Sequence, residues 1–370
     1  MPRLGGAVRW RVRTTPRRGV GPGPSGMRRF AVLNPLLPLL LVLVVLAGCR
    51  TSVEHLPSNH WSQEEDCCPP LVSGLEMEYL GVGGWLIRHG GSSLLTGPFF
   101  SNPGMLDAAL GHIEADTALI DAFLPPVDDV TAILVGHGHY DHLMDVPYIA
   151  RVHAPESRVY GSRTTVHTLR GDPDLDRDRL VDMEPHAGDV EGAGEWVHVE
   201  GGGIRFMALR SGHAPHYMDL NLYSGHHDEP LERLPDRATG WLEGQTFAFL
   251  IDLLDPDGEP IYRIHYQDAA AEPPHGFPPW LPDRRPVDLM IVCVPGAEEV
   301  NGYPEGIVGH LAPRTVLLGH WEDFFRPRTE GLRLSPGADL DAFIRRLERA
   351  LPEGGGWFLP EPGTRIDASG

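Results

Sequence analysis

Residues 131–145 read TAILVGHGHYDHLMD, and this stretch decides which fold the chain can adopt. Ala132 to Val135 are apolar or β-branched, and they predict a short buried strand that ends at Gly136. The turn that follows carries four side chains of metal-binding types: His137, His139, Asp141 and His142. Four such residues within six positions, directly after a buried strand, indicate a metal site rather than a polar surface loop.

The four side chains divide into two pairs. Alternation along an extended segment points His137 and His139 the same way, whereas Asp141 and His142 open a helix and face an adjacent position. Imidazole and carboxylate ligands in this mixture suit zinc, with iron or manganese as alternatives.

The six residues HGHYDH, His137 to His142, resemble the HxHxDH signature of the metallo-β-lactamase superfamily, and the resemblance extends from about Leu75 to the C-terminus. It implies an α/β fold, a four-layer αββα sandwich with the metal site at one edge of the two sheets. It also implies two divalent metal ions. In that arrangement the first ion is held by His137, His139 and His213, the second by Asp141, His142 and His320, and Asp268 bridges them.

The later residues of this set each follow a strand-like run. His213 lies in SGHAPH, 71 residues after His142, and His320 follows TVLLG. Asp268 ends the second half of a hairpin, TFAFLIDLL and EPIYRIHYQD, around Pro256-Asp257-Gly258. Asp252 is a rival for the bridging position, but it lies inside the first strand of that hairpin rather than at its end.

Two further residues are candidates for contact with a substrate. Tyr140, inside the motif, either donates a hydrogen bond to substrate or packs beneath the loop. His216 either lines the substrate opening or lies on the surface.

The resemblance implies a reaction as well as a fold. A hydroxide that bridges the two metals would attack an ester, lactone or phosphodiester bond, and Asp141 would orient this hydroxide. Asp268 together with His142 makes the site more similar to glyoxalase II, ascorbate-6-phosphate lactonase and N-acylphosphatidylethanolamine phospholipase D than to β-lactamases. Two alternatives stay open: a non-catalytic surface module that keeps a metal, and an exported β-lactamase.

One position departs from the pattern of the resembled family. There, the strand preceding this region ends in a phrase such as LLTDP, whose aspartate supports the metal histidines from behind. Here the phrase is LLTGP, with Gly97 in that place. The loss of such support weakens metal binding by one or two orders of magnitude unless another carboxylate replaces it. The candidates for that replacement are Asp107, Asp128 and Asp129.

The chain begins with a segment that is not part of the fold. From Met27 the sequence is MRRFAVLNPLLPLLLVLVVLAGCR, a positive start followed by an apolar core. Leu46-Ala47-Gly48-Cys49 resembles a bacterial lipobox, which implies that Cys49 is lipidated and that translation starts at Met27. We therefore predict a leader and signal peptide over residues 1–48, a tether over 49–72 and a single domain over 73–370. The location is then the membrane of the bacterial cell envelope, on its periplasmic or surface side.

Composition excludes one class of partner. Removing the eight arginines before Cys49 from the 31 basic residues leaves 23 against 51 acidic residues, a formal charge of −28. Binding to nucleic acid depends on clustered positive charge and is not expected. The expected partners are a small-molecule or lipid substrate and, through Cys49, the membrane.

The remaining predictions concern structure. Leu75 to Phe100 predict a twisted pair of strands with Gly-Gly at the bend, and residues 142–152 predict one helix. A closing helix from about Gly337 to Leu351 places its apolar side chains on one face. Cys67 and Cys68 form a disulfide with each other or with Cys293, although the apolar run DLMIVCV favours a buried thiol for Cys293.

Overall fold

The computed structural model describes residues 71–215 and 222–367, which contain two mixed sheets of seven strands each. The first sheet has the order β14-β1-β2-β3-β4-β5-β6. Its strands are β1 (Glu76–Gly81), β2 (Gly84–His89), β3 (Ser92–Thr96), β4 (Ala132–Leu134), β5 (Arg158–Gly161), β6 (Leu180–Asp182) and β14 (Arg365–Asp367). Strands β3 to β6 run parallel to one another, whereas β14, β1, β2 and β3 pair antiparallel.

The second sheet has the order β13-β12-β11-β10-β9-β8-β7. Its strands are β7 (Val197–His198), β8 (Ile204–Arg210), β9 (Phe247–Leu254), β10 (Pro260–Gln267), β11 (Leu289–Cys293), β12 (Thr315–Gly319) and β13 (Gly356–Phe358). Strands β10 to β13 are parallel, and β9 runs antiparallel to both of its neighbours, β8 and β10. Strands β8, β10 and β12 therefore all point the same way, and their carboxyl ends lie at the same edge of the sheet.

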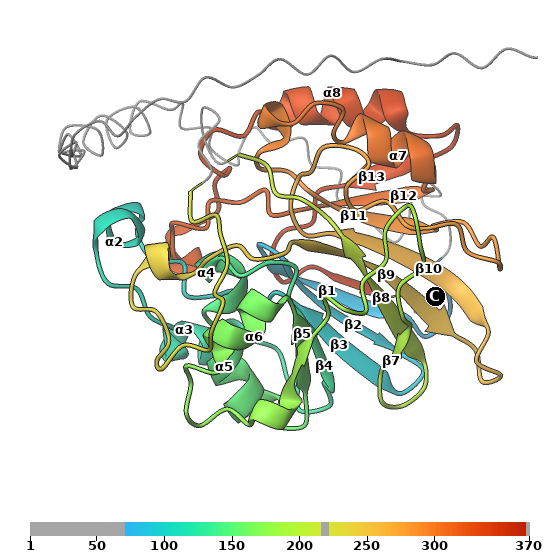
Figure 1. Cartoon of the computed structure of the whole chain (residues 1–370). Helices are drawn as coiled ribbons and strands as arrows, with labels where there is room; N and C mark the ends of the chain where they lie inside the picture. The colour runs from blue at the N-terminus through green and yellow to red at the C-terminus, as the bar shows by residue number, and fades with distance from the viewer. Residues whose placement is uncertain (1–70, 216–221, 368–370) are drawn as a thin grey trace, which may run out of the picture. The chain divides into compact units, whose positions relative to one another are not determined.

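Helices cover the outer faces of the two sheets (Figure 1). On one side lie α2 (Met105–Leu110), α3 (Thr117–Phe123), α4 (Tyr140–Leu143), α5 (Val146–Tyr148) and α6 (Arg163–Leu169). On the other side lie α7 (Glu305–Leu311) and α8 (Leu340–Ala350). The layers run helix, sheet, sheet, helix, and the predicted four-layer αββα sandwich is confirmed.

The core is divided by the sheets. Tyr79 and Trp85 of the first sheet belong to the same buried cluster as Phe206 and Phe249 of the second sheet. A separate cluster lies under the helices of the first sheet and contains Val135. Each fully buried aromatic or aliphatic side chain contributes roughly 1.5–3 kcal/mol relative to exposure, so the two sheets are held mainly by apolar contact. In α8 the buried face consists of Leu340, Phe343, Ile344 and Leu347, as the helical spacing of the apolar residues predicted.

Two local predictions were wrong. Leu75 to Phe100 form three strands rather than two, because the chain turns a first time after Gly81 and again at Gly90-Gly91, where both glycines adopt positive φ. The single helix predicted for 142–152 is broken into α4, α5 and a π-helical turn over Ile149–His153. Pro147 stands at the start of α5, where its missing N–H is tolerated, and α4 ends before it.

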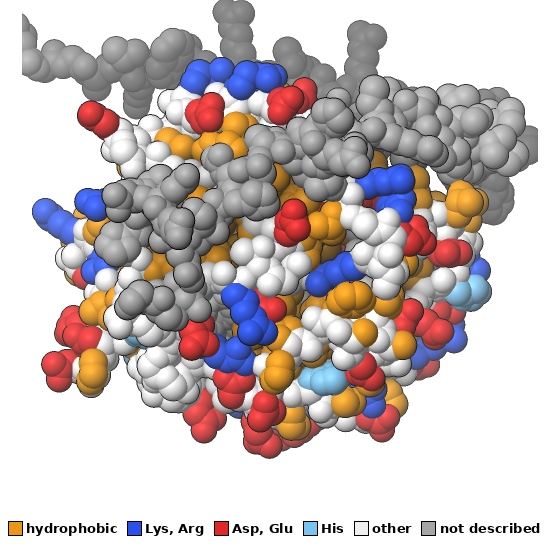
Figure 2. All heavy atoms as spheres, turned by 180° about the vertical axis from the view of Figure 1, so that it is seen from behind, with side chains coloured by type: hydrophobic (Ala, Val, Ile, Leu, Met, Phe, Trp, Pro, Cys, Tyr) orange, Lys and Arg blue, Asp and Glu red, His pale blue; other side chains and the backbone are white. Residues whose placement is uncertain are grey.

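Several predictions fall on residues outside the described part of the chain. The leader, the lipobox with Cys49, the tether up to residue 70, Cys67, Cys68 and His216 all lie there. Cys293 is described, and it is a buried free thiol on β11, as predicted. Among the described residues, no helix is both long and apolar enough to span a membrane. On the face in Figure 2, basic and acidic side chains are interspersed over the described surface.

A buried carboxylate ties the segment after β3 to the helical layer. Oδ2 of Asp145 accepts hydrogen bonds from the backbone N–H groups of Phe100 at 2.6 Å and Ser101 at 3.0 Å, and Oδ1 accepts from the Ser101 hydroxyl. Burial raises the pKa of Asp145 to about 6. The sequence analysis assigned Asp145 no role.

Replacing Asp145 by alanine should lower the free energy of unfolding by about 2–4 kcal/mol, because three buried donors lose their acceptor. Denaturant unfolding followed by circular dichroism measures this change. Asp128→Ala is the matched control, since Asp128 is exposed, and we expect it to stay within about 0.5 kcal/mol of the unmodified chain. Equal stabilities for the two variants would contradict this role of Asp145.

Candidate metal centre

Three histidines from two sheets form the first cluster. His137 and His139 lie in the turn after β4, and His213 lies three residues beyond the end of β8. The ring centroid of His137 is 4.6 Å from that of His139 and 4.7 Å from that of His213, and the third pair is 4.9 Å apart. One ligand nitrogen from each ring lies within 4.8 Å of the others, which is a spacing that can hold a metal ion.

Asp141, His142 and His320 form the second cluster. Asp141 and His142 come from α4, and His320 directly follows β12. Oδ2 of Asp141 lies 3.6 Å from Nε2 of His142 and 3.3 Å from Nε2 of His320, so both histidines direct the same ring nitrogen at this carboxylate. His137 and His142 join the two clusters, with ring centroids 4.2 Å apart.

The backbone of His320 is held in an unusual conformation. Its φ is +58°, a left-handed value that costs a residue with a side chain roughly 1–2 kcal/mol. The His320 N–H donates to the Tyr79 hydroxyl at 2.8 Å, and that hydroxyl donates to Oε2 of Glu322 at 2.7 Å. These contacts fix the loop that presents the imidazole, so Tyr79 and Glu322 are site residues that the sequence analysis missed. The one available signal was a glutamate two positions after the last histidine of the motif set.

Asp268 directly follows β10 and is 2% exposed. Its Oδ2 lies 2.6 Å from Nδ1 of His137 in a hydrogen bond, and its Oδ1 lies 3.1 Å from Nδ1 of His142. The Tyr266 hydroxyl donates to Oδ1 of Asp268 and also lies 2.9 Å from the carbonyl oxygen of Gly83. The rival residue, Asp252, is inside β9, where it is paired with Arg205 and Arg263 rather than with any histidine.

The electrostatics of the site favour cations. Burial alone raises the pKa of Asp268, but the adjacent His142 and His137 outweigh it, and the pKa lies well below its usual range. For Asp141, burial is likewise opposed by His142 and His320, and the net pKa is lowered. The two carboxylates are therefore ionised at neutral pH, and their negative charge favours a divalent cation at the site.

The donor set fits divalent metal ions. Nε2 of His137 is buried and has no hydrogen-bond partner among the described residues, while Nδ1 of the same ring is held by Asp268. In a metal-binding histidine, one ring nitrogen usually binds the metal and the other donates a hydrogen bond to a carboxylate. His137 has this arrangement, because its second nitrogen is buried without a protein partner among the described residues. Besides the two clusters, His137, His142 and Asp268 form a third set of donors close enough to hold a metal ion.

Of the two residues predicted to contact a substrate, Tyr140 is described by the structure and His216 is not. The ring of Tyr140 is buried and packs against Phe99 and Phe324, with centroids 6.1 Å and 6.5 Å away, so it lies beneath the loop. Its contact with a substrate stays a prediction, as does that of His216, which lies outside the described residues.

Two residues near the first cluster were not predicted. The ring of Tyr223 lies 6.2 Å from that of His139, and burial raises its pKa. Burial also raises the pKa of Glu243, although the neighbouring His137 opposes this increase. Both lie between the end of β8 and the start of β9.

None of the three carboxylates proposed to replace an aspartate at position 97 reaches the histidines. Asp129 pairs with Arg88 at 2.7 Å and accepts from Ser93, while Asp107 and Asp128 are exposed. A Cβ atom on Gly97 would lie 3.3 Å from Nδ1 of His142, so position 97 does face the second cluster. Asp268 is the carboxylate that the structure places next to that nitrogen.

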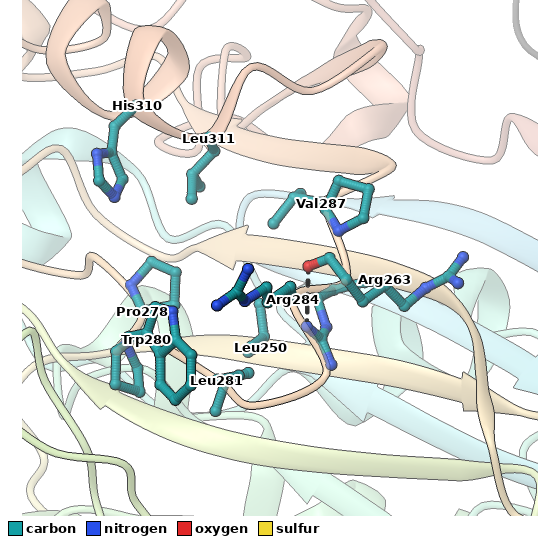
Figure 3. A pocket seen from close by; sticks show the side chains of 12 residues that line it. Leu250, Arg263, Pro278, Trp280, Leu281, Arg284, Val287, His310 and Leu311 are labelled. Carbon is teal, nitrogen blue, oxygen red and sulfur yellow. Dashed lines mark hydrogen bonds between the residues drawn. The ribbon is translucent and has the colours of Figure 1, made fainter.

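A cavity of about 270 Å³ lies elsewhere, against β9, β10 and the end of α7 (Figure 3). Trp280, Leu281 and Leu311 form apolar parts of its wall, and Arg263 donates to the carbonyl oxygen of Arg285 at its base. None of the residues of the two clusters lines it. We therefore do not connect this cavity with the metal centre.

Comparison with known proteins gives a likeness of fold. No protein-family model and no curated protein matches the chain. The metallo-β-lactamase fold protein YhfI from Bacillus subtilis is 13% identical, with a TM-score of 0.46 over 79% of this chain and 99% of its own. The metallo hydrolase Igni18 from Ignicoccus hospitalis is 13% identical, with a TM-score of 0.44 over 79% of this chain and 97% of its own.

A third solved structure is the isothiocyanate hydrolase from Delia radicum gut bacteria, which is 13% identical, with a TM-score of 0.45 over 79% of this chain and 98% of its own. At these identities and scores, the likeness carries no information about the reaction. The ligands and the chemistry must be argued from the side chains of this chain.

Zinc should stabilise the chain against unfolding, because only the folded state brings the two clusters together. At a free zinc concentration about 1,000 times the dissociation constant, the gain is about 4 kcal/mol per site. Thermal or denaturant unfolding in zinc and in chelator measures it. His213→Ala should reduce the gain, whereas His226→Ala, which alters an exposed histidine outside both clusters, should not. Equal gains for the two variants would exclude His213 as a ligand.

Proposed function

We propose that this chain is a metal-dependent hydrolase that acts on an ester, lactone or phosphodiester bond. The observation that supports it best is the meeting of two three-residue clusters, His137, His139 and His213 beside Asp141, His142 and His320. Structural zinc sites are usually single, closed and four-coordinate, whereas catalytic sites have about three protein ligands and an open position. Two adjacent sets of three donors fit the second description.

The first cluster would hold one divalent ion and the second cluster another. Zinc suits this mixture of imidazole and carboxylate, and iron or manganese are the alternatives. When bound, such ions supply water that is deprotonated near neutral pH and polarise the attacked carbonyl or phosphoryl group.

The side chains of this chain supply binding and orientation. Asp141, ionised and 7% exposed, would orient the attacking water through its carboxylate. Because no serine or cysteine nucleophile is needed, the buried thiol of Cys293 has no role in this proposal. Tyr223 and Glu243, in the segment beside the first cluster, are the nearest described candidates for contact with substrate.

A surface module that keeps a metal without turnover is the competing function. An exported β-lactamase is a third possibility, against which Asp268 is an argument, because such enzymes generally lack a bridging aspartate. That argument depends on Asp268 acting as a bridge. A substrate panel must therefore include a β-lactam beside the lactone and the phosphodiester.

The zinc-loaded chain should hydrolyse at least one of three chromogenic substrates: a phosphodiester, a lactone or a cephalosporin. Asp141→Asn should lower kcat by about 10²–10⁴-fold, since it removes the charge that orients water and weakens a ligand of the second ion. The control is Asp128→Asn, an exposed aspartate, for which kcat should be unchanged. No turnover of any substrate by a chain with two bound zinc ions would favour the metal-keeping module.

We also propose that lipidated Cys49 anchors the protein to the bacterial envelope, where a lipid substrate would be within reach. The support is the sequence LAGC after an apolar core and two arginines. Two or more acyl chains hold a protein stably, at about 0.8 kcal/mol per buried methylene.

Cys49→Ser should leave an unprocessed precursor or release unlipidated protein from the membrane. Fractionation of cells, with a mass measurement of the retained protein, distinguishes the outcomes. Processed protein that stays in the membrane despite the substitution would exclude lipidation at Cys49. Cys293→Ser is the control, because this thiol is buried within β11 and its loss should not change fractionation.

A further inference from the structure

We propose that Asp268 is a positioning residue that holds His137 and His142 from behind, rather than a ligand between two metal ions. The inference rests on the proposed metal site and departs from the bridging role that the sequence analysis gave this residue. It would make Asp268 the carboxylate that compensates for the glycine at position 97.

The first observation is which ring nitrogen Asp268 contacts. Its Oδ2 bonds Nδ1 of His137 at 2.6 Å, and Nε2 of that ring is the buried atom without a hydrogen-bond partner among the described residues. The hydrogen bond on one nitrogen of an imidazole decides which nitrogen is left to bind a metal. For His137 the metal-binding atom is therefore Nε2.

The second observation concerns the ring nitrogens of His142 and His320 in the other cluster. Nε2 of His142 faces Oδ2 of Asp141 at 3.6 Å, as Nε2 of His320 does at 3.3 Å, so these atoms define the second metal position. Nδ1 of His142 lies 3.1 Å from Oδ1 of Asp268, at an angle too poor for a hydrogen bond in this structure.

The geometry of the imidazole ring then argues against a bridge. The two nitrogens of one ring point to nearly opposite sides. A carboxylate oxygen that binds zinc lies about 2.0–2.2 Å from the ion. An oxygen that contacts Nδ1 is much farther than this from an ion bound to Nε2 of the same ring. Asp268 makes this contact with one histidine of each cluster, so it lies behind both metal positions.

Glycine leaves the space that this arrangement requires. A Cβ atom on Gly136 would lie 2.1 Å from Oδ2 of Asp268, so a larger residue directly before His137 would displace the carboxylate. The Tyr266 hydroxyl, which donates to Oδ1, and the burial of the side chain fix the carboxylate further. Position 97 faces the same nitrogen of His142 that Asp268 faces, with 3.3 Å between that nitrogen and a Cβ placed on Gly97.

The experiment measures zinc affinity and zinc stoichiometry on the purified chain, by competition with a chromophoric chelator. Asp268→Ala should weaken zinc binding by about 10–100-fold while two equivalents still bind at saturating zinc. Adding Gly97→Asp to that variant should recover part of the affinity, because the new carboxylate faces Nδ1 of His142. Adding Gly97→Asn instead is the matched control, and it should recover none, since it supplies similar volume without the charge.

Asp268→Asn keeps the volume of the side chain and is the variant to compare if Asp268→Ala does not fold. In the zinc-loaded protein, nitrogen-proton correlation spectra should show His137 and His142 protonated at Nδ1, and Asp268→Asn should shift both signals. If Asp268→Ala binds only one equivalent of zinc at saturation, and if adding Gly97→Asp does not restore affinity, the proposal is overturned and Asp268 is a bridging ligand. Zinc binding without turnover would instead count against the hydrolase alone.

Discussion

The arrangement of this protein depends on burying ionisable side chains where the two sheets meet. Asp268 and His137 are each less than 3% exposed, and their 2.6 Å contact joins a residue after β10 in one sheet to a residue after β4 in the other. A buried charge is tolerated only when it is paired and hydrogen-bonded. This pair therefore constrains how the sheets pack, and removing Asp268 would leave Nδ1 of His137 without its hydrogen-bond partner.

The direction of the strands makes such contacts possible. Because β8, β10 and β12 are mutually parallel, His213, Asp268 and His320 all leave the same edge of the second sheet. The motif after β4 reaches that edge from the first sheet. The apolar core between the sheets holds these loops in register, and the loops have little freedom to place their side chains elsewhere.

Local strain at the site is offset by specific hydrogen bonds. His320 adopts a left-handed φ, and the Tyr79 hydroxyl with Glu322 holds its N–H in place. Asp145 fixes the segment after β3 in a similar way, through backbone N–H groups. In both cases a buried carboxylate accepts hydrogen bonds that hold the path of a loop.

The sequence by itself determined the strand before HGHYDH, the hairpin that carries Asp268 and the amphipathic closing helix, because periodicity and turn residues are local properties. The resemblance of HGHYDH to the HxHxDH signature also indicated which side chains would meet. The third strand before residue 100 and the break in the helix at Pro147 were missed. Two Gly-Gly pairs occur in that region, and either can form the turn. A proline can either begin a helix or interrupt one.

Only the tertiary structure decided how those side chains meet. Which nitrogen of His137 faces Asp268, and which carboxylate lies next to Nδ1 of His142, depends on how β10 packs against the turn after β4. Tyr79 and Glu322 became site residues for the same reason, although 241 residues separate Tyr79 from His320. Contacts between residues so far apart in the chain leave no local pattern, because the folded core alone brings them together.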